Sequence, residues 1–287
     1  MLPAYVNDWY IATDSRTGPW SLLNGTVPTM EQENNANIIR SFFLNEGWTI
    51  NAICGMLGCI QGESTINPAF IQQTNRWRLP NSAADLTDVP NSVAKNFFRE
   101  YYNVQQRAFG MGLVQWDGYS VVLASGEEQQ KMVAFAIANN IVWYDGWTQL
   151  YRLRFECDYD QSNQTHIFFY PVRYSGIVYT FDNFPTSTET PEILAAAWTS
   201  GYERNAGGVG YRADNARYWY NYFTGAAAPP VITPADFSPP LEDDPTEPPF
   251  DPAHPVDPGL PSSRLPNWLL SVIIRKRKEM LLKWRRV

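Results

Sequence analysis

The sequence predicts a mainly helical α+β fold with a β-hairpin insertion, followed by a proline-rich linker and a basic amphipathic C-terminal helix. Apolar residues recur at the 3.6-residue period of an α-helix in several segments. One other stretch is rich in aromatic and β-branched residues, which favour strands. The composition then changes abruptly after Gly225, and residues 229–266 hold thirteen of the chain's 22 prolines.

Length and charge narrow the range of functions. The 287 residues are enough for one sizeable core and a small additional unit. A formal net charge of −7 argues against nucleic acid as the main partner of the folded body. The three cysteines give no disulfide framework, and Cys54 and Cys59 should point to different faces of one helix. We therefore expect a chain made in a reducing cytoplasm, with no classical signal peptide and no membrane span.

The first elements are an extension and two helices. Residues 1–33 carry Gly-Pro and Val-Pro turn signals and are expected to form an N-terminal extension. A helical pattern then begins at Asn34 and ends near Gly47. Thr49 is well placed to cap the next helix, because its hydroxyl can accept a hydrogen bond from a free backbone N–H. The apolar stripe of the first helix is formed by Ile38, Ile39, Phe42 and Phe43.

The middle of the chain alternates loops, helices and one hairpin. Polar residues interrupted by prolines predict a loop over 64–96. Helical patterns follow at about 127–140 and 144–157. The aromatic run at 165–184 predicts a β-hairpin that turns at its Ser-Gly pair. A last helical region covers about 190–223 and is interrupted by the glycine-rich sequence NAGGVG.

Beyond the predicted folded domain of residues 34–224, the chain carries a linker and a basic tail. The acidic, proline-rich linker of residues 225–266 cannot bury enough apolar surface to fold, and we expect it to be extended. The tail of residues 267–287 is a basic amphipathic helix that fits an anionic membrane surface, an acidic groove on another protein, or a phosphate backbone. Its apolar side is formed by Leu269, Leu270, Ile273, Ile274, Met280, Leu281 and Trp284.

Glu63 is the first candidate for chemistry, because it ends an otherwise apolar helix. It lies three residues after Ile60 and seven after Met56, so it continues their stripe. Desolvation and the negative end of the helix would both favour a protonated carboxyl group there. General-acid cleavage of a glycosidic bond requires such an acid. The alternative is a frayed helix end that points to water. Three glycines on this helix leave room for another backbone: Gly55, Gly58 and Gly62.

Two further segments contain polar and aromatic groups suited to a sugar. In FGMGLVQWDG, residues 109–118, Gln115 can hydrogen-bond an N-acetyl group and Trp116 can offer a stacking surface to a sugar ring. An ordinary turn followed by a core tryptophan is the alternative. Later in the chain Tyr202 and Glu203 precede the glycine-rich turn, which a buried helix end explains equally well.

Together, GMLGCIQGESTINP, GMGLVQW and the late YER resemble the phage tail-tip lysozyme family over roughly residues 34–224. These virion-associated muramidases have a fold similar to goose-type lysozymes and lytic transglycosylases. The resemblance implies that Glu63 is the catalytic acid. The residues that contact the substrate or support the acid would be Ser64, Gln115, Trp116 and Tyr202.

The resemblance also implies a function and a location. The expected function is cleavage of the glycan strands of peptidoglycan by a phage tail component that opens the cell wall locally during infection. The protein would be made in the host cytoplasm and released by host lysis, which explains export without a signal. We favour another virion protein as the partner of the 267–287 tail, with an anionic membrane surface as the alternative.

Two versions of glycan cleavage stay open at the level of sequence. A hydrolase needs a water molecule and usually a second carboxylate. A lytic transglycosylase needs one acid/base, because the 6-hydroxyl of the sugar closes a 1,6-anhydro ring. The candidates for a second carboxylate are Asp85, Asp88 and Asp117, and Asp117 is favoured by its place beside the Gln-Trp pair.

Other classes of function have less support. A zinc amidase or endopeptidase usually needs several histidine ligands, and the chain has only His166 and His254. A cysteine peptidase would need a thiol paired with His166, whereas Cys54 and Cys59 are expected to pack as small hydrophobes. We therefore expect an enzyme with no metal and no cofactor. The non-enzymatic alternative is a structural or carbohydrate-binding tail protein on a lysozyme scaffold.

Overall fold

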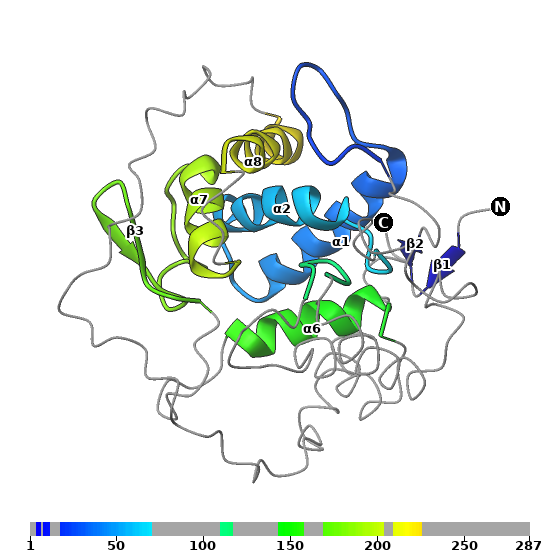
Figure 1. The fold of residues 1–287 in the computed structure, drawn as a ribbon, viewed down its shortest axis with the longest axis horizontal. Coiled ribbons are helices and arrows are strands. Elements are labelled where there is room, and N and C mark those ends of the chain that lie inside the picture. The colour runs from blue at the N-terminus through cyan, green and yellow to red at the C-terminus, as the bar shows by residue number, and fades with distance from the viewer. Residues whose placement is uncertain are drawn as a thin grey trace, which may run out of the picture.

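The computed structural model describes residues 4–6, 8–11, 18–70, 110–116, 143–157, 169–203 and 209–225, without the side chains of 4–6 and 155–157. Within these residues the chain is mainly helical with two small antiparallel sheets, which confirms the predicted α+β class (Figure 1). The elements are β1 (Ala4–Val6), β2 (Trp9–Ile11), α1 (Met30–Asn45), α2 (Ile50–Ser64), α6 (Gly146–Cys157), β3 (Val172–Tyr174), β4 (Ile177–Tyr179), α7 (Pro191–Gly201) and α8 (Val209–Thr224).

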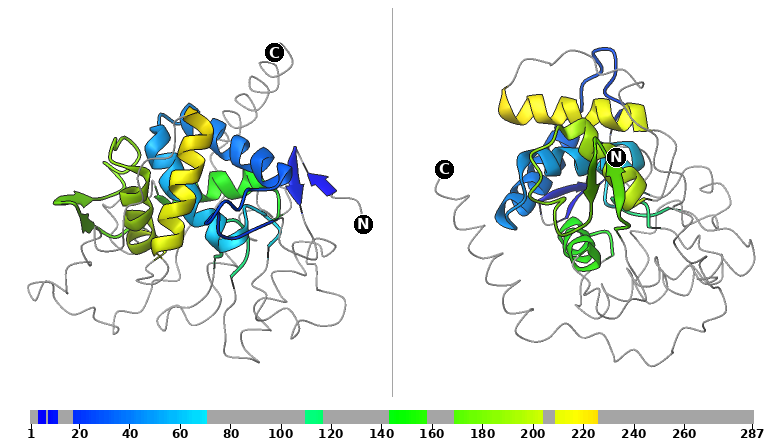
Figure 2. Two further views of the ribbon diagram at one scale, coloured as in Figure 1. Left: turned by 90° about the horizontal axis from the view of Figure 1, so that it is seen from above. Right: turned by 90° about the vertical axis from the view of Figure 1, so that its left-hand side faces the viewer.

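Helix α2 lies at the centre of the domain, with α1, α7 and α8 packed around it (Figures 1 and 2). Its residues 52–61 are all buried, which fits a sequence that is apolar on nearly every side. Thr49 caps the helix as predicted, because its hydroxyl accepts a hydrogen bond from the backbone N–H of Ala52 at 3.1 Å. The catalytic candidate therefore stands at the end of the most enclosed helix of the domain.

Two glycines of α2 set how closely its neighbours approach. A Cβ atom at Gly58 would lie 2.5 Å from the carbonyl oxygen of Arg212 and 2.6 Å from the backbone nitrogen of Ala216, both in α8. A Cβ at Gly55 would lie 2.7 Å from the Cβ of Leu194 in α7. These contacts confirm the expectation that the glycines admit neighbouring backbones. They bring the first turns of α8 against the second half of α2.

Helix α1 begins four residues before the predicted start at Asn34. Thr29 and Gln32 form a capping box, in which each side chain accepts a hydrogen bond from the other residue's backbone N–H. The N-terminal extension also packs against this helix. Asn35 accepts a hydrogen bond from the N–H of Tyr10 and donates one to its carbonyl, both at 2.9 Å. The extension thereby contributes the fully buried ring of Trp9 to the core.

The later elements agree with the sequence in type and place. Helix α6 lies within the predicted 144–157, and the region 190–223 contains α7 and α8. The hairpin of β3 and β4 turns at Ser175 and Gly176, whose φ angles are 51° and 80°. Two successive positive φ angles define the type I′ turn that suits a two-residue hairpin. The predicted helix at 127–140, the linker and the basic tail lie outside the described residues.

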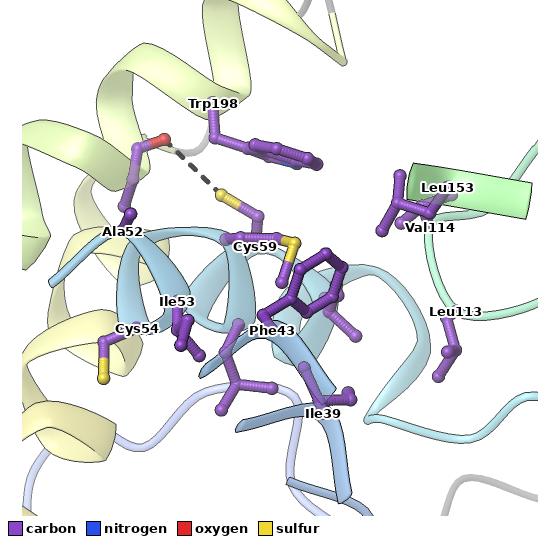
Figure 3. Close-up of a cluster of buried hydrophobic side chains, with 14 of the residues drawn as sticks. Ile39, Phe43, Ala52, Ile53, Cys54, Cys59, Leu113, Val114, Leu153 and Trp198 are labelled. Carbon is purple, nitrogen blue, oxygen red and sulfur yellow. Dashed lines mark hydrogen bonds between the residues drawn. The ribbon is translucent and has the colours of Figure 1, made fainter. Parts of the chain in front are cut away.

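The core is rich in aromatic side chains, and both cysteines that the structure describes are part of it (Figure 3). Cys54 and Cys59 are free thiols and fully buried, which confirms that they do not pair with each other. In Figure 3 the dashed line marks the hydrogen bond that the Cys59 thiol donates to the carbonyl of Ala195. No helix among the described residues is long and apolar enough to cross a membrane.

Candidate active site

Glu63 lies in the last turn of α2, and that helix end is well ordered by hydrogen bonds. The N–H of Thr65 donates to the carbonyl of Gln61, and Thr65 adopts the left-handed conformation that ends many helices, with φ of 54°. The side chain of Glu63 is 24% exposed. The helix end is therefore not frayed, and the carboxyl group is partly rather than fully buried.

Arg212 of α8 holds the Glu63 carboxyl group in place. The Arg212 side chain is only 2% exposed, and its Nη2 atom forms an ion pair with Oε1 of Glu63. The same nitrogen lies 3.0 Å from Oε2 of Glu203, which follows the end of α7. One buried guanidinium thus binds two carboxyl groups that come from different helices.

Glu203 is the more buried of the two acids, with 9% of its side chain exposed. Burial raises the pKa of the Glu203 carboxyl from its ordinary value of 4.5 to about 8, and the nearby charge of Glu63 adds to the rise. The positive charge of Arg212 and a hydrogen bond from Cys59 oppose this rise without cancelling it. Glu203 is therefore largely protonated at neutral pH.

The charges around Arg212 explain why one proton is retained. Both carboxyl groups contact the same nitrogen, so their nearest oxygen atoms are at most about 6 Å apart. Two ionised acids would leave one uncompensated negative charge in a largely buried site. Glu63 lies in the last turn of α2 and Glu203 lies just after α7, and helix dipoles disfavour negative charge at these C-terminal ends. The site can thus hold one proton on Glu203, close to the partly exposed Glu63.

Cys59 and Tyr211 complete the surroundings of these groups. Burial raises the pKa of the Cys59 thiol well above its ordinary value, so the thiol stays neutral and is a poor nucleophile. Burial likewise raises the pKa of Cys54. These shifts argue against a cysteine peptidase. The ring of Tyr211 lies against Gly62, where a Cβ atom would be 2.5 Å from its Cε2.

Of the other predicted site residues that the structure describes, Ser64 and Trp116 are buried. Ser64 is fully buried and its hydroxyl donates to the carbonyl of Ile60 at 3.1 Å, which fits a supporting role at the helix end. Trp116 is 5% exposed and belongs to the core cluster. Tyr202 is partly buried and stacks on Trp198, with ring centroids 4.6 Å apart. Trp116 is therefore placed as a core tryptophan, which was the alternative to a sugar-stacking surface.

Gln115 organises the turn in which it lies. Its φ is 55°, and its amide nitrogen donates to the carbonyl of Gly112 at 2.8 Å and to that of Phe70 at 3.3 Å. The turn of residues 110–116 is thereby joined to the segment that follows α2 and Glu63. The amide holds two parts of the chain together, and it is only partly buried.

Several predicted residues lie outside the described part of the chain, namely Asp85, Asp88, Asp117, His166 and His254. Within the described part, no cluster of three or more His, Cys, Asp and Glu side chains could hold a metal ion. The sequence did not single out Arg212, and it gave Glu203 no catalytic role. The available signal was an acid and an arginine on either side of the glycine-rich sequence, in segments that end and begin the contacting helices α7 and α8.

Comparisons with known proteins match this architecture. The model of a family described as phage tail lysozyme matches residues 34–223. Morphogenesis protein 1 of Bacillus phage B103 is 30% identical to the chain over 203 residues, which cover 70% of this chain. The aligned part corresponds to 42% of the length of that relative.

Proposed function

Because the chain belongs to the phage tail lysozyme family and is a component of the phage tail, we propose that it cleaves the glycan strands of bacterial peptidoglycan. One observation supports this most directly. Glu63 is a partly exposed acid in the last turn of α2, fixed by a buried arginine and backed by a second carboxyl group. A glycosidase needs an acid that is both held in place and able to reach the substrate.

In the proposed reaction, Glu63 donates a proton to the oxygen of the scissile glycosidic bond. Glu203 does not reach the substrate, because it lies behind Arg212 with little exposed surface. Its role is to position Arg212 and, through it, Glu63. The bond between the anomeric carbon and the glycosidic oxygen breaks, water or the 6-hydroxyl of the sugar attacks the anomeric carbon, and the attacking group gives its proton to the Glu63 carboxylate.

The site also supports a second candidate function. The ion pair with Arg212 engages one carboxyl oxygen of Glu63 and holds this side chain against α8, which restricts its approach to a leaving group. On that basis the domain would bind glycan without cleaving it, as a structural component of the tail. Both functions place the protein in contact with peptidoglycan and with other tail proteins, and we propose residues 267–287 as the segment that contacts the latter.

The first prediction separates these functions. We expect Glu63→Gln in the full chain to lower the rate of glycan cleavage at least about 10²-fold without loss of folding, because the amide keeps the shape but has no acidic proton. The measurement is release of soluble fragments from purified peptidoglycan, with mass spectrometry of the new ends. A reducing end would show hydrolysis, and a 1,6-anhydro end would show transglycosylation.

Asp182→Asn is the matched control, because Asp182 is exposed and lies after β4. It removes the same charge away from the Arg212 cluster and should leave the rate unchanged. Near-normal cleavage by a folded Glu63→Gln protein would exclude Glu63 as the acid. Absence of cleavage by the unsubstituted protein, with glycan binding intact, would favour the structural function.

A further inference from the structure

An exposed tryptophan lies close to the candidate active site. Trp20 precedes α1, in the segment before the residues 34–223 matched by the family model. Its side chain is 45% exposed, and no other tryptophan among the residues described here is classed as exposed. Large aromatic surfaces are usually covered, so an indole left in solvent on a fixed backbone indicates a partner.

The backbone around Trp20 is held by buried amide side chains. Asn215 of α8 donates to the carbonyl of Trp20 at 3.0 Å and accepts from the N–H of Leu22 at 2.8 Å. Gln61 of α2 donates to the carbonyl of Pro19. Both amide residues are fully buried. The main chain on either side of Trp20 is therefore fixed to the two helices that carry Glu63 and Arg212, while the ring stays in solvent.

Tyr211 connects this ring to the catalytic candidates. The rings of Trp20 and Tyr211 meet edge to face, with centroids 4.9 Å apart. Tyr211 also lies against Gly62, the residue before Glu63. The centroid of its ring is 5.1 Å from the guanidinium carbon of Arg212. Tyr211 is thus a shared neighbour of the exposed indole and of the Glu63–Arg212 pair.

We propose that Trp20 and Tyr211 form a saccharide subsite that holds an N-acetylated hexosamine ring of the glycan strand beside Glu63. This inference rests on the proposed function, since it identifies where the same substrate is held. A pyranose ring has an apolar face of C–H groups, which matches the negative face of an indole. Burial raises the pKa of the Tyr211 phenol to about 12, so its hydroxyl stays neutral and can hydrogen-bond a sugar hydroxyl.

Other exposed apolar side chains in the same segment offer a different explanation. Leu23, Val27 and Met30 are exposed, and such a group of side chains could dock on another protein. Trp20 differs from them because its ring contacts Tyr211 beside the catalytic candidates. This connection to the Glu63–Arg212 pair through Tyr211 favours the glycan as the occupant, and docking to a protein becomes an outcome of the test.

The test measures binding of a soluble β-1,4-linked oligomer of N-acetylglucosamine to the full chain carrying Glu63→Gln, which prevents turnover. We expect Trp20→Ala to raise the dissociation constant for this oligomer about tenfold, as measured by titration calorimetry. Trp20→Phe, which keeps an aromatic face, should retain most of the affinity. Leu23→Ala is the matched control from the same exposed segment and should leave the affinity unchanged. Thermal unfolding checks that every variant is folded.

A second measurement uses chains with Glu63 intact. Trp20→Ala should raise KM for peptidoglycan fragments with little change in kcat. Unchanged affinity in Trp20→Ala, an equal loss in Leu23→Ala, or no oligomer binding by the chain with Trp20 intact would each overturn the subsite. Unchanged affinity with loss of Trp20→Ala protein from assembled virions would identify a protein partner instead. If Glu63→Gln cleaves normally while Trp20→Ala binds weakly, the acid is misassigned and the subsite stands.

Discussion

At the scale of single residues, Arg212 makes two kinds of contact, one through its backbone and one through its side chain. Its carbonyl oxygen packs against Gly58, and its guanidinium binds Glu63 and Glu203. One positive guanidinium can balance the negative charge of only one carboxylate. The second buried carboxyl group must therefore keep its proton, or its uncompensated negative charge would destabilise the fold. The cluster is therefore expected to respond to pH through Glu203 in particular.

The pH dependence of stability has a definite sign. Between about pH 4.5 and about pH 8 the folded chain keeps the Glu203 proton that the unfolded chain has already released. Since the folded state binds more protons there, the free energy of unfolding should fall as the pH rises through this window. We expect Glu203→Gln, which resembles the protonated acid, to make that decline shallower. Urea unfolding at several pH values between 5 and 8 provides the measurement.

The exposed acid Asp182 again serves as the control, because Asp182→Asn should leave the pH profile parallel to that of the unsubstituted chain. Parallel profiles for the Glu203→Gln chain and the unsubstituted chain would contradict the assignment of the retained proton to Glu203.

At the scale of elements, the crossing of α2 and α8 creates the site. The absence of a side chain at Gly58 lets the α8 backbone touch α2, which brings Arg212 within reach of the last turn of α2. The obstructing atoms at this crossing are backbone atoms, so a larger residue cannot be accommodated by a rotamer change. Gly58 therefore permits both the close packing of α2 on α8 and the contact of Arg212 with Glu63.

We expect Gly58→Ala to destabilise the fold by about 1–3 kcal/mol, although alanine is the better helix former. The new methyl group would meet the carbonyl oxygen of Arg212 and the nitrogen of Ala216. Gly210→Ala in the first turn of α8 is the control, because nothing lies within 4 Å of its Cβ position. It should be neutral or stabilising by up to about 1 kcal/mol. The free energy of unfolding of both variants is measured with denaturant. Equal stability of the Gly58→Ala and Gly210→Ala proteins would refute the steric explanation.

Local signals predicted the elements better than the contacts between them. The cap at Thr49 and the Ser-Gly turn are recognisable because their chemistry lies within a few residues of sequence. The start of α1 at Met30 also has a local signal, the Thr29 to Gln32 spacing of a capping box, although the apolar periodicity alone predicts a start at Asn34. The partnership of Glu63 with Arg212 joins residues 149 positions apart and depends on a helix crossing, so no local pattern contains it.

At the scale of the whole molecule, one buried amide joins three distant segments. Gln149 of α6 donates to the carbonyl oxygens of Pro68 at 2.7 Å and Trp143 at 2.9 Å. It also accepts from the N–H of Leu113 at 2.8 Å. The segment after α2, the turn of residues 110–116 and the start of α6 are thereby held together, which fixes the surroundings of Gln115.

We expect Gln149→Leu to lower the free energy of unfolding by about 3 kcal/mol or more, because three buried backbone groups lose their partner. Asn51→Leu is the control, since its amide also bonds backbone carbonyls but is partly exposed. Its loss should stay below about 1.5 kcal/mol. Chemical denaturation measures the free energy of unfolding of both variants. Equal losses in the Gln149→Leu and Asn51→Leu proteins would show that Gln149 has no special role in joining the segments.

The packing of the N-terminal residues has a practical consequence for anyone who expresses the domain as a fragment. The family match begins at residue 34, inside the first turns of α1 and after its Thr29 cap. A fragment cut there would start with an uncapped, shortened helix and would leave a void where Trp9 is buried. Boundaries drawn from sequence matching alone would thus remove both the Thr29 cap and the buried Trp9, whereas a fragment that includes residues 9 and 29 retains them.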